Sequence, residues 1–113
     1  MYKIKYTKQA KKDIENIFDY IINKLNNRTA ANNLKNKIKK EEKNIQMFPY
    51  GNAEISFVKP LEHKYRKSIV NNYELFYRID DANKTIIITR NLHNKQNIKS
   101  KLSKIFNVWD SLI

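Results

Sequence analysis

The spacing of apolar residues changes along the chain, and each spacing predicts a different kind of element. Residues 2–6 alternate between apolar and basic at every second position, which is the period of a half-buried strand. From Ala10 to Leu25 apolar residues recur at spacings of three and four, the stripe of an amphipathic helix, and Thr7 precedes it as an N-cap. These patterns predict a strand followed by a helix over about residues 8–26.

A second helical stripe follows directly. Apolar residues recur from Ala30 to Phe48, Thr29 stands before them as an N-cap, and Pro49 ends the pattern. Residues 49–62 hold the only glycine and both prolines, so they predict a loop. The two stripes together predict a helical hairpin.

Residues 63–93 predict an antiparallel meander of three strands. Runs rich in β-branched and aromatic residues cover 63–70, 73–80 and 85–93, and turn-forming residues separate them. The last run begins Thr-Ile-Ile-Ile-Thr, apolar on both faces, as is typical of a central strand. We expect Tyr65, Tyr73 and Tyr77 to be core residues, because strand alternation directs most of them inward.

The turn at residues 71–72 leaves one register open. A strict two-residue turn places Arg66 on the side of Tyr77, whereas a longer loop places it on the side of Glu74. Apolar spacing of the helical kind returns after Gln96, which predicts a final helix at about residues 96–112. The expected order is β-α-α-β-β-β-α in one domain over residues 1–113.

The composition excludes several classes of site but assigns no activity. The absence of cysteine excludes disulfides, thiolate zinc sites and cysteine nucleophiles, and two histidines argue against a metal site. Lys and Arg total 23 against 11 Asp and Glu, a net charge of +12 that attracts polyanions or acidic proteins. Nothing near Met1 resembles a signal peptide and no apolar run approaches a membrane span, so we expect a cytoplasmic protein with no membrane partner.

Several short motifs lie in order along the chain. They are Tyr2-Lys3-Ile4, Phe48-Pro49, Tyr65-Arg66-Lys67, Tyr-Glu-Leu-Phe-Tyr-Arg-Ile-Asp at 73–80 and Ile-Thr-Arg-Asn-Leu-His-Asn-Lys at 88–95. As an ordered set in a small basic chain, they resemble the RelE/ParE superfamily of toxins from bacterial type II toxin–antitoxin systems. The resemblance implies an α+β fold in which an N-terminal strand and a two-helix hairpin pack on a twisted antiparallel sheet.

The resemblance implies one of two activities. RelE-like members are endoribonucleases that cut translated mRNA at the ribosome, whereas ParE-like members share the fold, lack the catalytic set and poison DNA gyrase. Either implies a cognate acidic antitoxin, with a heterotetramer as one assembly, and no cofactor. We expect the ribonuclease, with the gyrase inhibitor and a catalytically degenerate binding module as alternatives.

Metal-free RNA cleavage requires a base, an acid and cations that stabilise the phosphorane. The resemblance places Arg66 and Lys95 as the phosphate-stabilising cations and His93 as general acid or base, with Arg90 as a further phosphate contact. For Arg90 an ion pair with Glu74 or Asp80 across the sheet is an equal alternative.

One departure from the ribonuclease pattern favours the gyrase branch. Classical RelE-like enzymes keep an arginine where this chain has Glu74, and a carboxylate there repels phosphate unless it acts as the base. Glu62, in the loop before the second strand, is the other candidate base.

Overall fold

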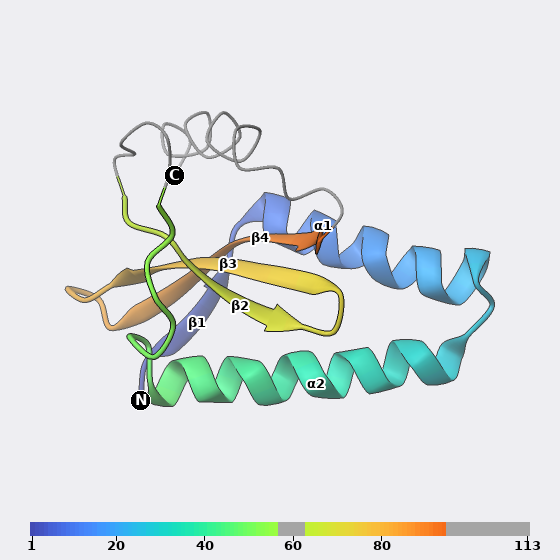
Figure 1. Ribbon diagram of the computed structural model, residues 1–113, viewed down its shortest axis with the longest axis horizontal. Coiled ribbons are helices and arrows are strands. Elements are labelled where there is room, and N and C mark those ends of the chain that lie inside the picture. The colour runs from blue at the N-terminus through green and yellow to red at the C-terminus, as the bar shows by residue number, and fades with distance from the viewer. Residues whose placement is uncertain (57–62, 95–113) are drawn as a thin grey trace.

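The computed structural model describes residues 1–56 and 63–94, which form an α+β domain (Figure 1). Its elements are β1 (Lys3–Tyr6), α1 (Lys8–Asp19), the π-helical turn η1 (Tyr20–Lys24), α2 (Arg28–Met47), β2 (Arg66–Val70), β3 (Tyr73–Asp80) and β4 (Thr85–His93). The predicted fold class and element order are confirmed over this part of the chain. The helix expected at about residues 96–112 lies outside the described residues.

The sheet has the order β1-β4-β3-β2, so β4 is central, as its doubly apolar sequence predicted. β2, β3 and β4 form the expected antiparallel meander, and β1 adds to β4 in parallel, with Ile4 opposite Ile86. The parallel pairing follows from the route of the chain, because both helices lie between β1 and the meander and return the chain to the sheet.

The β2–β3 connection is the strict two-residue turn. Val70 pairs with Tyr73 and Arg66 with Tyr77, and Asn71 adopts a positive φ of 54°. Asparagine tolerates this left-handed conformation better than most residues, which suits it to a tight hairpin. Arg66 therefore shares a face with Tyr77 rather than with Glu74.

The first helix begins as predicted and ends differently. The Thr7 hydroxyl accepts a hydrogen bond from the Ala10 backbone N–H at 3.1 Å, which confirms the N-cap. The regular α-helix stops at Asp19 and continues as the wider turn η1 to Lys24, slightly short of the predicted end.

The second helix is capped two residues earlier than expected. Asn27, not Thr29, is the N-cap, and its side-chain oxygen accepts from the Ala30 N–H at 3.0 Å. The cap must lie three residues before the N–H it satisfies, and Asn27 meets this condition while Thr29 is already helical. At the other end α2 stops at Met47, so Phe48 leaves the apolar stripe and is 66 % exposed.

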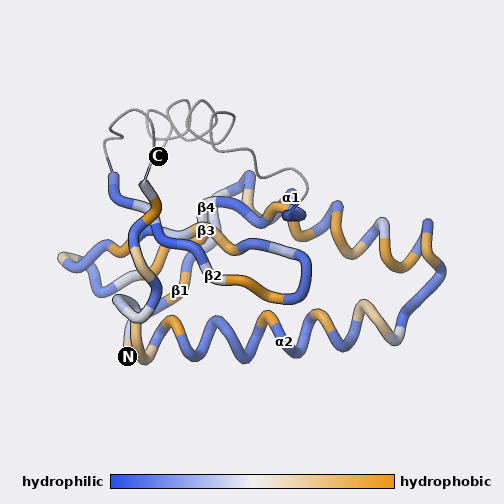
Figure 2. Tube along the Cα trace, in the orientation of Figure 1, coloured by the Kyte–Doolittle hydropathy of each residue, from blue (hydrophilic) through white to orange (hydrophobic). Residues whose placement is uncertain are grey.

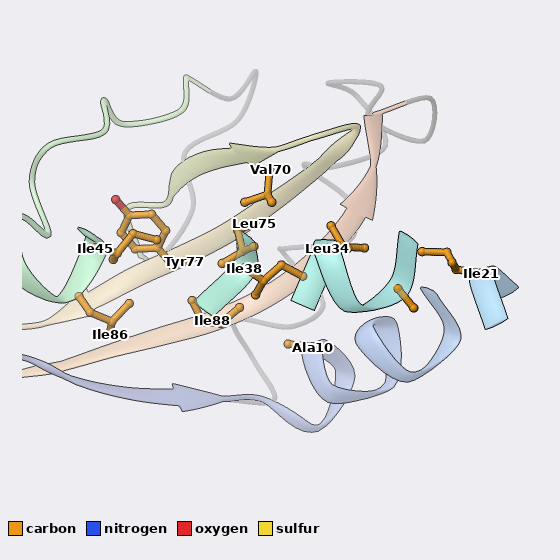
Figure 3. Packing of buried hydrophobic residues seen from close by; sticks show 11 residues of the cluster. Ala10, Ile21, Leu34, Ile38, Ile45, Val70, Leu75, Tyr77, Ile86 and Ile88 are labelled. Carbon is orange, nitrogen blue, oxygen red and sulfur yellow. The ribbon is translucent and has the colours of Figure 1, made fainter. Parts of the chain in front are cut away.

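The core lies between the helical hairpin and one face of the sheet. Figure 2 shows the apolar positions of α2 turned toward the sheet and its polar positions turned away. In Figure 3, Leu34, Ile38 and Ile45 of α2 face the strands. The strand residues they meet are Leu75, Tyr77, Ile86 and Ile88. Tyr65 and Tyr77 are fully buried, as the alternation predicted.

Candidate functional site

Arg66 is the first residue of β2, and its side chain fastens the segment that follows α2. One guanidinium nitrogen donates to the Asn52 carbonyl, and another lies 3.5 Å from Glu54 Oε1. The guanidinium also lies over the Tyr50 ring, 4.9 Å from its centroid. Tyr77, opposite Arg66, donates its hydroxyl to the Pro49 carbonyl at 3.0 Å. Arg66 is therefore engaged at this end of the sheet and is only 14 % exposed.

His93 is the last residue of β4 and lies at the other end of the sheet. It pairs with Tyr73 in the β3–β4 ladder, and the two rings meet edge to face with centroids 5.3 Å apart. Burial raises the pKa of the Tyr73 hydroxyl, so this ring stays protonated at neutral pH.

The structure does not bring Arg66 and His93 together. Arg66 is opposite Tyr77 and His93 is opposite Tyr73, so the two lie four β3 residues apart on either side of that strand. Strand geometry converts this into about 13 Å along β3 and about 10 Å across it. With the Arg66 guanidinium bound to Asn52 and Glu54 and His93 packed against Tyr73, the two side chains do not converge on one phosphodiester.

Arg90 is held by a carboxylate that the sequence analysis did not consider. Its Nε donates to Asp13 Oδ2 at 2.6 Å and its Nη2 to Asp13 Oδ1 at 3.0 Å. The Asn91 backbone N–H also donates to Asp13, at 3.0 Å. Asp13 on α1 is thus the carboxylate in contact with Arg90, where the sequence offered Glu74 or Asp80 as an equal alternative to phosphate. The available signal was its position, three residues after Ala10, inside the apolar stripe of α1.

Glu74 lies on the opposite face of β3 from Arg66. Its side chain is 8 % exposed and forms an ion pair with Lys67, with Nζ and Oε1 3.0 Å apart. The register therefore separates this candidate base from Arg66 and His93. Glu62 and Lys95, the remaining predicted site residues, lie outside the described residues.

Among the hollows that the described residues line, two are of interest. One, of about 440 Å³, runs between the helices and is mainly apolar, lined among others by Tyr6, Phe18, Ile22 and Ile38. The other, of about 350 Å³, is a polar cleft beside the end of β3. Within residues 1–56 and 63–94, no three histidine or acidic side chains gather as a metal ion would require.

The polar cleft is bordered by a hydrogen-bonded group that joins three distant segments. Asp81, in the β3–β4 turn, accepts from the Tyr2 hydroxyl at 2.6 Å and from the Tyr50 hydroxyl. The Tyr2 hydrogen bond, followed by that of Tyr50, lowers the pKa of Asp81. The same carboxylate raises the pKa of Tyr50 to about 12. Sequence reasoning missed this group because its members are far apart in the chain.

Comparison with known proteins assigns the family. Residues 4–98 match the family model described as the ParE toxin of the type II toxin–antitoxin system parDE. The chain belongs to the ParE toxin family. The superfamily resemblance drawn from the motifs is therefore confirmed, and this ParE-family chain is a toxin of a type II toxin–antitoxin system.

One solved structure shares this fold, and a second shows a weaker similarity. A chain of the chromosomal ParDE toxin–antitoxin system from P. aeruginosa superposes with a TM-score of 0.62 at 20 % identity, covering 82 % of the ParE-family chain and 96 % of its own length. A chain of the RelBE2 toxin–antitoxin complex from Mycobacterium tuberculosis gives 0.49 at 17 % identity, covering 81 % and 96 %. No protein of curated function matches. None of the helices in the described part has the length and apolarity needed to span a membrane.

Proposed function

We propose that this ParE-family toxin acts by binding and inhibiting DNA gyrase, and that it does not cleave RNA. The observation that carries the proposal is the separation of Arg66 from His93 along β3. The family match supports the same choice, since ParE-like members are the gyrase-directed branch of the superfamily the motifs resemble.

Ribonuclease chemistry needs its groups on one phosphodiester. An acid or base must lie within about 3 Å of the proton it transfers, and cations must contact the same phosphorane. Here Arg66 is bound to Asn52 and Glu54, and Arg90 is bound in a bidentate pair by Asp13. Recruiting either arginine to RNA would leave a partly buried carboxylate or carbonyl without its partner, which opposes the change.

The surface is suited to binding rather than chemistry. The exposed face of α2 carries a row of lysines that do not contribute to the core: Lys35, Lys37, Lys39, Lys40 and Lys43. With the net charge of +12, this face steers the toxin toward a polyanionic target, such as an enzyme that carries DNA. We also propose that the toxin is neutralised by an acidic cognate antitoxin, for which the same field provides attraction.

A supercoiling assay tests the proposal. Purified gyrase is given relaxed plasmid, ATP and increasing amounts of the toxin, and we expect supercoiling to stop. His93→Ala should inhibit within about twofold of the parent, because the histidine performs no chemistry in this account. Relaxation by a type I topoisomerase on the same plasmid is the control for simple coating of DNA by a basic protein.

Two results would contradict the proposal. Supercoiling that continues at a large excess of folded toxin excludes gyrase as the target. Equal inhibition of gyrase and the type I enzyme assigns the effect to DNA coating.

A further inference from the structure

The polar cleft exists because β2 starts late. Its first residue, Arg66, is opposite Tyr77, so within the described ranges Arg78, Ile79 and Asp80 pair only with β4. The cleft beside this stretch of β3 is lined by Arg78 and Ile79 together with Tyr50, Glu54 and Asp81. The hollow therefore lies against the open edge of β3.

Arg78 lines this cleft, and one of its donors has no acceptor among the described residues. Its Nε atom is buried and has no hydrogen-bond partner among the described residues. A buried guanidinium N–H without an acceptor is costly, and arginine is the residue whose fork best matches a planar oxyanion. An oxyanion held by this guanidinium would supply the acceptor that the described residues do not.

The carboxylates nearby are already engaged. Asp81 accepts from two tyrosine hydroxyls, and Asp80 accepts from the side chain and backbone of Asn83. Glu54 faces Lys64 at 3.8 Å and Arg66 at 3.5 Å. Each of these acids contributes to local structure, so none satisfies the Arg78 Nε atom.

The net charge of the cleft favours a carboxylate over a phosphate as its ligand. Among the described residues that line the cleft, the permanent charges are three cations, Lys64, Arg66 and Arg78, against two carboxylates, Glu54 and Asp81. The balance is one positive charge, which a single carboxylate neutralises. A phosphate dianion would overcompensate it and meet repulsion from both acids.

We propose that Arg78 is the receptor for an aspartate or glutamate side chain of the acidic antitoxin, seated in the cleft beside β3. The inference rests on the proposed antitoxin partner and names one contact within it. The toxin's overall charge attracts the acidic segment, and the bidentate pair at Arg78 fixes one of its side chains.

The test uses the full chain and an acetylated, amidated hexaglutamate peptide as the probe. The Arg78 Nε–H signal is followed by nitrogen-edited NMR while the peptide is added at constant ionic strength. We expect that signal to shift and saturate, and Arg78→Gln to weaken binding by about tenfold, the loss typical of a charge-assisted pair. Arg28→Gln, which removes the same charge from an exposed helix terminus, should change binding by less than about twofold.

Arg78→Lys distinguishes the contribution of the forked guanidinium donors from that of the positive charge. It keeps the cation and lacks the two parallel donors, so most of the loss seen with Arg78→Gln should remain. Equal effects of Arg78→Gln and Arg28→Gln would overturn the proposal in favour of diffuse attraction. The same titration is repeated with inorganic phosphate and with acetate. A larger shift of the Arg78 Nε–H signal with phosphate than with acetate would overturn the proposal in favour of a phosphate ligand. No gyrase is present, so this outcome and the supercoiling result are independent.

Discussion

At the scale of single residues, the most consequential side chain is Asp13. Its carboxylate accepts from Arg90 Nε and Nη2, from the Asn91 N–H and from Gln9, and so joins α1 to the end of β4. Sequence placed Arg90 correctly near the end of the last strand but not its partner, because the pair spans 77 residues and depends on how the helix crosses the sheet. A polar residue inside an apolar stripe predicts a buried partner without naming it.

Removing this carboxylate should be strongly destabilising. Asp13→Ala leaves a nearly buried guanidinium without its counter-ion and the Asn91 N–H without an acceptor, so we expect a loss of about 3 kcal/mol in the free energy of unfolding. Glu15→Ala, an exposed acid on the same helix, is the matched control and should change it by less than about 0.5 kcal/mol. Urea denaturation followed by circular dichroism measures both. Equal effects of the two variants would mean that the ion pair is not structural.

The tyrosine–aspartate group gives a pH-dependent prediction. The raised pKa of Tyr50 means that the hydrogen bond to Asp81 favours the protonated hydroxyl, so its stabilising effect is present below pH 10 and is lost as the pH rises through about 12. The lowered pKa of Asp81 means the converse at the acid end: the effect is present above 3.8 and is lost as the pH falls through the folded-state value.

Asp81→Asn replaces the carboxylate whose hydrogen bond with the Tyr50 hydroxyl, followed by burial and by the carboxylate's charge, raises the pKa of Tyr50. The pKa of Tyr50 should then fall from about 12 toward its ordinary value of 10. The measurement is the tyrosinate absorbance titration of each protein after subtraction of the same protein carrying Tyr50→Phe. A pKa for Tyr50 that is unchanged by Asp81→Asn would show that the two side chains do not interact in solution.

At the scale of elements, the spacing of apolar residues predicted the features that depend on short stretches of sequence. Both helices, the meander and the central place of β4 could be predicted, because each depends on spacing within a short window. The turn at residues 71–72 could be located, but its two-residue form was left open and is settled only by the β2–β3 register. The parallel pairing of β1 and the bulge opposite Phe76 and Tyr77 could not, because they arise from long-range packing. The N-cap of α2 was misassigned by two residues, because Asn27 and Thr29 are both residue types that cap helices and they flank the first helical residue, Arg28.

The corrected cap can be tested with a pair of variants. Asn27→Ala removes the acceptor of the Ala30 N–H and should lower the free energy of unfolding by about 1 kcal/mol. Thr29→Ala removes a helical, exposed threonine and should be neutral or slightly stabilising, because alanine has the higher helix propensity. Thermal unfolding of the two variants distinguishes the caps. A larger loss from Thr29→Ala would restore the original assignment.

At the scale of the whole molecule, the register of the strands determines whether the basic residues form one site. The sequence correctly indicated that basic residues border the sheet, but whether they form one centre depends on which end of β3 each one faces. The pairings place Arg66 at one end and His93 at the other, and α1 supplies the acid that holds Arg90. A toxin fold with dispersed cations is suited to binding, and for this reason we propose gyrase inhibition in place of the ribonuclease expected from the motifs.

The measurement that tests this account most directly is primer extension on a reporter mRNA in a cell-free translation reaction containing the purified toxin. The account predicts intact mRNA at toxin concentrations that stop gyrase. Discrete, translation-dependent cuts that disappear with His93→Ala, in a variant that remains folded, would contradict it and show that the separated residues act on RNA after all.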